Sequence, residues 1–288
     1  MNLYHYCSNA AFLSILSTQE VWSSEFSLSN DLLEGKWIRE IFSQCCDDKR
    51  VTPYDKSALL ERFDSLIAIS GAAGFCMSEE GDLLSQWRAY ADNAAGVSIG
   101  FSKEYFEMLG DIKRDRNDAF NASIQKVEYN VTEQKKLISE HAERIFALVS
   151  EGALRIPTLA HGPETEEEKE KRVARFRAII MRFTIFIFYL YRLKNPAFAE
   201  EREWRLISHL FHTSKDDEPS PYSKMDFRAL SDRVLPFTRI RLEPLSLPAI
   251  TEVVLGPRNV TPQAIVEAAL AKHGYSHVSV RRSSASYR

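Results

Sequence analysis

The spacing of hydrophobic side chains changes along the chain, and the changes predict short strands that alternate with helices. Residues 3–6 form a β-like run, and the apolar side chains from Phe12 to Leu16 then recur at helical spacing. Residues 20–26 return to a strand pattern. The same patterns predict further helices at 36–47, 57–66 and 82–93, and further strands at 73–79, 95–102 and 124–130.

The second half of the chain opens with a helical block and ends in strands. Two long helical segments are expected at about 132–152 and 165–193, separated by the loop "LRIPTLAHGPE". Strand patterns resume after residue 200, and a last helix is expected at 261–274. We find no internal repeat and no low-complexity linker. These features predict a single α+β domain over 1–288, whose mixed or antiparallel sheet holds a large helical insertion at about 131–195.

Composition and charge favour a folded globular protein and count against a nonspecific nucleic-acid binder. The chain is 44% hydrophobic and 27% charged, which is typical of a folded globular protein. Its formal net charge of −3 supplies no overall positive field for nonspecific nucleic-acid binding. A nucleic-acid enzyme or binder stays open as an alternative only because of a local basic cluster at 241–282.

Cysteine usage and the apolar segments predict a cytoplasmic protein with no bound metal and no membrane association. The four cysteines have neither CxxC spacing nor a matching histidine cluster. The first twelve residues lack the basic and apolar segments of a signal peptide. The most apolar window, 178–194, contains Arg182 and is shorter than the ~20 residues of a membrane span.

The chain contains no Walker loop and no GxGxxG, GxSxG or HExxH motif, which removes the commonest nucleotide-binding, hydrolase and metalloprotease classes. Unusual polar and aromatic residues remain at the ends of predicted strands and on one helix, namely His5, Tyr6, Trp22, Ser23, Ser24, Asn30 and Arg88. Each also has a structural explanation: a hydrogen-bonded core histidine, ordinary turn chemistry, or the packing of a helix face. Arg88 is the residue of this group best suited to meet a phosphate or a carboxylate.

The stretch "FAEEREWRL", residues 198–206, raises a similar choice. Successive side chains of a strand point to opposite faces, so Glu201, Glu203 and Arg205 are expected on one face. Trp204 and Leu206 are expected on the other face. An internal Glu–Arg pair explains the pattern, and so does a pair of carboxylates that lines a cleft.

Several motifs together resemble a widespread bacterial family classed as a domain of unknown function, DUF2971. They are "LYHYCS", "VWSSEFSLSNDLLEG", "GFCMSEEGDLLSQWRAYADNAAGVSIGF", "LKNPAFAEEREWRLI" and "EVVLGP". They occur in the order of the family's motifs, from about residue 3 to residue 257. The layout in turn resembles the ADP-ribosyltransferase superfamily, which carries a His or Arg on the first strand, a Ser- or Tyr-containing second motif, and a late Glu, often in an ExE pair.

The second resemblance implies a fold with an ADP-ribosyltransferase-like β core and a role for each motif. His5 would bind a ribose hydroxyl of NAD, and Ser24 would support the nicotinamide–ribose pocket. Glu203 would be the catalytic carboxylate, with Glu201 positioning the acceptor. Trp22, Phe26 or Tyr6 would stack on nicotinamide.

The same resemblance completes the expected NAD site and its setting. Arg88 or Arg205 would neutralise the pyrophosphate of NAD, the substrate. The expected function is therefore an NAD-dependent ADP-ribosyltransferase or an NAD glycohydrolase, acting as a bacterial toxin or in phage defence. Its partners would be NAD or a related nucleotide, an unknown macromolecular acceptor and a regulatory protein. The alternative is a catalytically silent module of the same fold, which binds a nucleotide or a protein and in which Arg205 locks Glu203.

Overall fold

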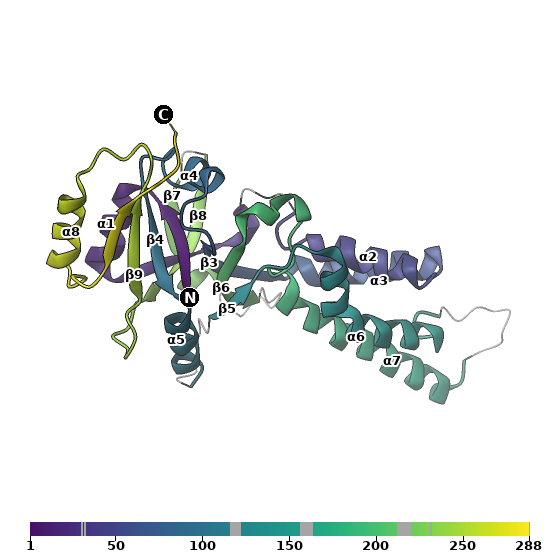
Figure 1. Ribbon diagram of the computed structural model, residues 1–288. Coiled ribbons are helices and arrows are strands. Elements are labelled where there is room, and N and C mark those ends of the chain that lie inside the picture. The colour runs from purple at the N-terminus through teal and green to yellow at the C-terminus, as the bar shows by residue number, and fades with distance from the viewer. Residues whose placement is uncertain are drawn as a thin grey trace.

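The protein combines α-helices with one large mixed β-sheet. The computed structural model describes residues 1–29, 31, 33–115, 122–155, 164–211, 221–230 and 232–287. Within these residues, ten strands join in a single sheet, most of whose pairings are antiparallel (Figure 1). The α+β class expected from the sequence is therefore confirmed at that level.

Strands and helices alternate along much of the chain. The strands are β1 (Asn2–Cys7), β2 (Glu20–Glu25), β3 (Ser70–Ser78), β4 (Val97–Ser102), β5 (Ser123–Lys126), β6 (Glu203–Phe211), β7 (Asp226–Ala229), β8 (Val234–Arg241), β9 (Ile250–Leu255) and β10 (Ser279–Arg282). The α-helices are α1 (Asn9–Thr18), α2 (Trp37–Asp48), α3 (Pro53–Ala68), α4 (Leu84–Tyr90), α5 (Lys103–Asp115), α6 (Val131–Ser150), α7 (Glu166–Phe186) and α8 (Gln263–Lys272). The short 3-10 helices are η1 (Phe26–Leu28), η3 (Ile187–Tyr189), η4 (Pro196–Glu201) and η5 (Pro221–Lys224).

Local capping explains where several helices begin. The Ser8 side chain accepts a hydrogen bond from the Ala11 amide at the start of α1. Thr165 and Glu168 form a reciprocal capping box at the start of α7. Asn195 caps η4, with Pro196 in the first position, where a missing N–H costs nothing.

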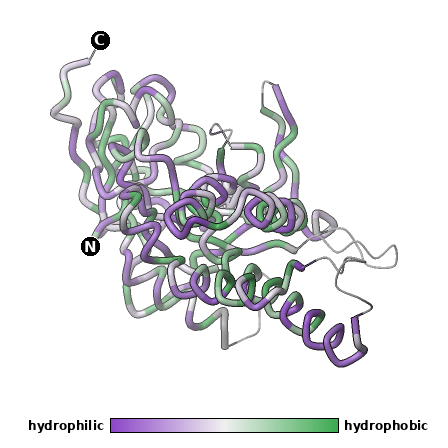
Figure 2. The backbone as a smooth tube through the Cα atoms, turned by 90° about the vertical axis from the view of Figure 1, so that its right-hand side faces the viewer, coloured by the Kyte–Doolittle hydropathy of each residue, from purple (hydrophilic) through white to green (hydrophobic). Residues whose placement is uncertain are grey.

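Two hydrophobic cores lie on opposite faces of the sheet. One core joins the sheet to α1, α5 and α8. The other joins it to α2, α3, α6 and α7, which extend from the sheet as an arm (Figure 1). Phe42, Phe63, Phe183 and Phe186 pack ring against ring at the centre of this arm. Hydrophobic and hydrophilic residues alternate along its helices, so each turns an apolar face to its neighbours (Figure 2).

The sheet divides at β3, and this division creates the candidate site. β6 pairs with β3 along its whole length and occupies one of its edges. The other edge is shared: β2 pairs with it at Ala73 and Gly74, and β1 pairs with it at Ser78. Neither strand pairs with residues 75–77 between these points. The sheet half that contains β1 therefore parts from the half that contains β2, and a short stretch of β3 lies at the base of the opening.

Gly74 allows a close approach beside this opening. A Cβ atom at this position would lie 1.9 Å from Cζ of Phe26. The Phe26 ring is itself stacked on Tyr191, and the Arg205 guanidinium lies 4.8 Å from its centroid. The ring therefore cannot move aside without disturbing its other contacts.

We expect Gly74→Ala to lower the free energy of unfolding by about 1–3 kcal/mol, because the added methyl group overpacks this contact. Urea unfolding of Gly74→Ala, Phe26→Leu and the double variant measures the effect. The smaller Leu side chain should relieve part of the clash, so the two single effects should not add. Additive effects would contradict the proposed contact.

Candidate functional site

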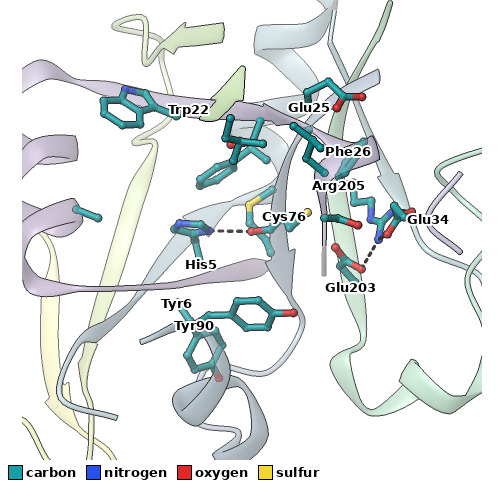
Figure 3. A pocket seen from close by; sticks show the side chains of 18 of the residues that line it. His5, Tyr6, Trp22, Glu25, Phe26, Glu34, Cys76, Tyr90, Glu203 and Arg205 are labelled. Atoms are coloured by element: carbon teal, nitrogen blue, oxygen red, sulfur yellow. Dashed lines mark hydrogen bonds and ion pairs between the residues drawn. The ribbon is translucent and has the colours of Figure 1, made fainter. Parts of the chain in front are cut away.

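The opening between β1 and β2 is a cavity of about 740 Å³, which is within the range of small-molecule sites. Figure 3 shows His5 and Tyr6 on the β1 side, Trp22 and Glu25 on the β2 side, and Cys76 of β3 between them. Glu203, Arg205 and Glu34 lie at one end. The lining also includes further polar and aromatic side chains, among them Tyr4, Ser24, Phe26, Gln86, Tyr90, Lys194, Phe198, Glu201, Arg228 and Arg233.

His5 bridges the gap between β1 and β3. Its Nδ1 lies 2.9 Å from the Cys76 carbonyl, which no strand pairs on this edge. A carbonyl only accepts, so Nδ1 carries the proton and Nε2 keeps a lone pair. Burial lowers the pKa of His5 to about 4, and the charge of Arg228 acts in the same direction. His5 is therefore a neutral ring at pH 7 that can accept a hydrogen bond from a ligand hydroxyl.

Tyr6 lines the cavity, but its hydroxyl is used within the protein. It donates to the Glu80 carbonyl at 2.6 Å and accepts from the Leu83 amide at 2.9 Å. Its ring meets Trp87 edge to face, with centroids 4.8 Å apart. Tyr6 therefore fixes the loop that leads into α4 and contributes only its ring surface to the cavity.

The residues of β2 divide between two environments because side chains alternate along a strand. Trp22 and Ser24 line the cavity. Trp22 stacks on Phe237, with ring centroids 4.3 Å apart, and Ser24 Oγ accepts from Arg228 at 3.0 Å. Ser23 is fully buried and does not line the cavity, which corrects the expectation that it binds the cofactor.

Of the other two expected cofactor-binding residues, Arg88 and Asn30, only Arg88 lies in the described part of the chain. Arg88 is not part of the cavity lining, because it lies in the last turn of α4 with its guanidinium 5.8 Å from the Tyr287 ring centroid. The structure therefore does not bring Arg88 together with the cavity residues that were expected to bind NAD. Asn30 lies outside the described residues.

Glu201 and Glu203 both line the cavity, but not through strand alternation. Glu201 ends η4, and the next residue, Arg202, has φ 44°, a left-handed conformation that turns the chain before β6 begins. The two carboxylates are instead joined by Lys194, whose Nζ lies 2.6 Å from Glu201 Oε2 and 3.1 Å from Glu203 Oε2. Tyr90 also donates to Glu201, at 3.4 Å.

Arg205 is buried at the centre of an ion-pair network, with 1% of its surface exposed. Its two terminal nitrogens donate to both oxygens of Glu34, at 2.6 and 2.8 Å. The same guanidinium donates to Glu203 Oε2 at 2.8 Å and to the Tyr191 carbonyl at 2.8 Å. The expected Glu–Arg pair is therefore present, and Arg205 is not available to a pyrophosphate.

The network sets the charge states of the two glutamates. Burial alone would raise the pKa of Glu203, but Arg205 and then Lys194 hold it down to about 2. For Glu201, burial dominates and raises the pKa, although Lys194 opposes the shift. Glu203 is thus a fixed anion at pH 7, whereas Glu201 is the carboxylate of the pair better suited to exchange a proton.

Sequence patterns did not single out Lys194 or Arg228, and they gave Glu34 no role in the site. Glu34 is separated from Arg205 by 171 positions, so no local pattern links them. Lys194 directly precedes Asn195 and Pro196, which cap η4. A lysine at such a position in the sequence looks like an ordinary surface residue. The one available signal was charge: Lys194 and Arg205 flank the acidic "AEERE" segment within a dozen residues.

The described part of the chain lacks the features of two other kinds of site. Among the residues described, no group of three or more His, Cys, Asp or Glu side chains is arranged to hold a metal ion. No helix in that same part combines the length and apolar character needed to cross a membrane.

We expect Arg205→Met to lower the free energy of unfolding by about 3–5 kcal/mol, because it leaves the buried carboxylates of Glu34 and Glu203 without their shared cation. Arg202→Met is the matched control, since that side chain is 56% exposed and pairs with Glu80 at the surface. It should cost less than about 1 kcal/mol. Equal losses in urea unfolding would show that the buried network adds nothing.

Acid should weaken the fold through Glu203. Its pKa is about 2 in the folded protein, against about 4.3 for an unfolded glutamate, so its ionisation stabilises the fold above the unfolded value. That contribution is lost as the pH falls from about 5 to about 2. The free energy of unfolding of Glu203→Gln, measured across this window, should fall less steeply than that of the wild type. Parallel slopes would contradict the assigned charge state.

Comparison with known proteins identifies a family but no relative of known activity. The model of a family described as "Protein of unknown function (DUF2971)" matches residues 86–206, a shorter span than the motifs suggested. No curated protein and no solved structure matches the chain. The matched span includes residues 86–90 of α4, Lys194 and both cavity glutamates, Glu201 and Glu203. The resemblance to the DUF2971 family is therefore confirmed over residues 86–206.

Proposed function

We propose that the cleft binds NAD and that the protein is an ADP-ribosyltransferase-like enzyme, or an NAD glycohydrolase with the same site. One observation carries this proposal. His5, Trp22 and Ser24, near the start of the chain, line the same cavity as Glu201 and Glu203, nearly 200 residues later. These are residues for which the motif order suggested NAD-binding and catalytic roles.

The spacing of the cleft supports one ligand reaching both ends. β3 lies between β1 and β6 at its Ser78 end, so the backbones of His5 and Glu203 are two strand spacings apart, about 10 Å. A nicotinamide riboside is long enough to contact both side chains. The Nε2 lone pair of His5 would accept from a ribose hydroxyl, and Trp22 or Tyr90 would offer a ring surface to the base.

The reaction breaks the bond between C1′ of the ribose and the nicotinamide nitrogen, and nicotinamide leaves with the bonding electron pair. C1′ gains positive charge in the transition state, as in glycoside hydrolysis. A carboxylate that stays ionised stabilises this charge, and Glu203 is held ionised at pH 7. The acceptor oxygen, from water or a macromolecule, then bonds to C1′ while its proton passes to Glu201.

The fixed state of Glu203 also favours a second candidate, a nucleotide-binding module without catalysis. Lys194 and Arg205 both donate to the same oxygen of Glu203, Oε2. Their positive charges oppose the stabilisation of a cationic transition state by this carboxylate. In this second function, the cleft recognises the nucleotide and the network serves only to hold β6 in place.

The decisive experiment is nicotinamide release from NAD by purified protein. We expect Glu203→Gln to reduce the rate by roughly 100-fold or more, because it removes the preorganised negative charge. Glu201→Gln should reduce transfer to the acceptor more than it reduces NAD binding. The adjacent Glu200→Gln is the matched control, since Glu200 is exposed and does not line the cavity.

The outcomes separate the two candidates. Release that persists in Glu200→Gln and disappears in Glu203→Gln supports the enzyme. A thermal shift of the wild type on adding NAD, with no release, favours the binding module. If NAD gives neither nicotinamide release nor a thermal shift, both candidates are contradicted. Thermal unfolding of each variant without ligand verifies that the loss does not come from misfolding.

A further inference from the structure

Arg228 is a cation of the cleft that lacks a counter-ion among the described residues. Lys194, Arg205 and Arg233, the other Lys and Arg side chains of the cavity lining, each pair with at least one carboxylate. Arg228 lines the same cavity and makes no ion pair within the described part of the chain. Its Nε is buried without a hydrogen-bond partner. Such a group costs free energy unless a ligand or water satisfies it.

The surroundings of Arg228 are those of an anion subsite. One terminal nitrogen donates to Ser24 Oγ at 3.0 Å, and the guanidinium lies 5.7 Å from the Trp22 ring centroid. Because Ser24 accepts this bond, its own hydroxyl proton is free to donate to a further group. Burial lowers the pKa of Arg228, but an arginine stays charged at neutral pH.

The register of the strands places these groups on one wall. Arg228 of β7 stands opposite Leu235 of β8, and Phe237 of β8 stands opposite Ser24 of β2. Residues that alternate along paired strands share a face, so Arg228, Phe237, Ser24 and Trp22 form one surface. That surface combines a guanidinium fork, a hydroxyl and aromatic rings.

We propose that Arg228 and Ser24 form the phosphate subsite of the cleft, so that its ligand is a phosphorylated nucleotide with the base or sugar against Trp22. The guanidinium fork can donate two parallel hydrogen bonds to phosphate oxygens, and Ser24 adds a third. This inference rests on the proposed function in placing a nucleotide in the cleft. It goes further in assigning the phosphate contact to β7, far from the arginines that the sequence suggested.

The carboxylates beside β6 disfavour an anion in that part of the cavity. Glu34, Glu201 and Glu203 gather there around Lys194 and Arg205, whose charges are already paired. A phosphate placed there would meet three carboxylates. The ligand is therefore oriented, with its phosphate at β7 and its glycosidic bond toward β6.

Paired probes that differ only in a phosphate test the subsite. Nicotinamide mononucleotide is compared with nicotinamide riboside, and AMP with adenosine, by calorimetric binding to wild type and to Arg228→Gln. In the wild type, the phosphorylated member of at least one pair should bind roughly 10- to 100-fold more tightly. In Arg228→Gln this preference should disappear, with a much larger loss of affinity for the nucleotides than for the nucleosides.

Two further variants make the result specific. Arg228→Lys keeps the charge but not the fork, so it should keep only part of the preference. Arg239 lies on the neighbouring strand β8 and outside the cavity lining. Arg239→Gln removes one positive charge, as Arg228→Gln does, and should keep the whole preference for the phosphorylated probes. Thermal unfolding without ligand identifies any variant that fails to fold.

The results distinguish this inference from the function on which it rests. A phosphate preference that survives in Arg228→Gln would overturn the subsite while leaving nucleotide binding intact. Binding of nucleotide and nucleoside with equal affinity to the wild type would do the same. Wild-type protein that binds none of the four probes and no NAD would overturn the proposed function and the subsite together.

Discussion

The buried guanidinium of Arg205 is the interaction on which the site depends. It connects four parts of the chain that are remote in sequence: Glu34 before α2, the Tyr191 carbonyl after α7, Glu203 at the start of β6, and the Phe26 ring after β2. A buried cation of this kind does not guarantee a more stable protein than an apolar core would. It does require each partner to be in place, because any carboxylate left without it would be an uncompensated buried charge.

The same cation links the fold to the chemistry of the cleft. Arg205 keeps Glu203 ionised, and Lys194 extends the network to Glu201 near the cavity surface. The pKa values of the two glutamates therefore shift in opposite directions because their surroundings differ, although their side chains are the same. The cavity itself arises from the division of the sheet at β3. There β1 and β2 share one edge of β3, and the Cys76 carbonyl between them accepts a hydrogen bond from His5.

Local patterns predicted the elements of this fold better than the contacts that complete the site. Alternation correctly placed Arg205 beside Glu203, because both lie in or at the start of one strand. It failed for Glu201, because the positive φ of Arg202 turns the chain before the strand begins. Glu34 and the shared edge of β3 depend on pairing between distant segments, which no spacing along the sequence records. The helical arm likewise joins α2 and α3 to α6 and α7 across the sheet strands between them.

The distribution of charge in the cleft accounts for an orientation that its shape alone would not impose. At the β6 end, each cation is matched to carboxylates, so this end is closed to an anion and suited to a group that gains positive charge. At the β7 end, Arg228 has hydrogen-bonding capacity left over and a hydroxyl beside it. A nucleotide carries both kinds of group, a fixed negative phosphate and a glycosidic carbon that becomes positive as its bond breaks. In the proposed function, the Arg228 side of the cleft complements the phosphate and the β6 side complements the glycosidic carbon, so we expect the nucleotide to bind in that direction.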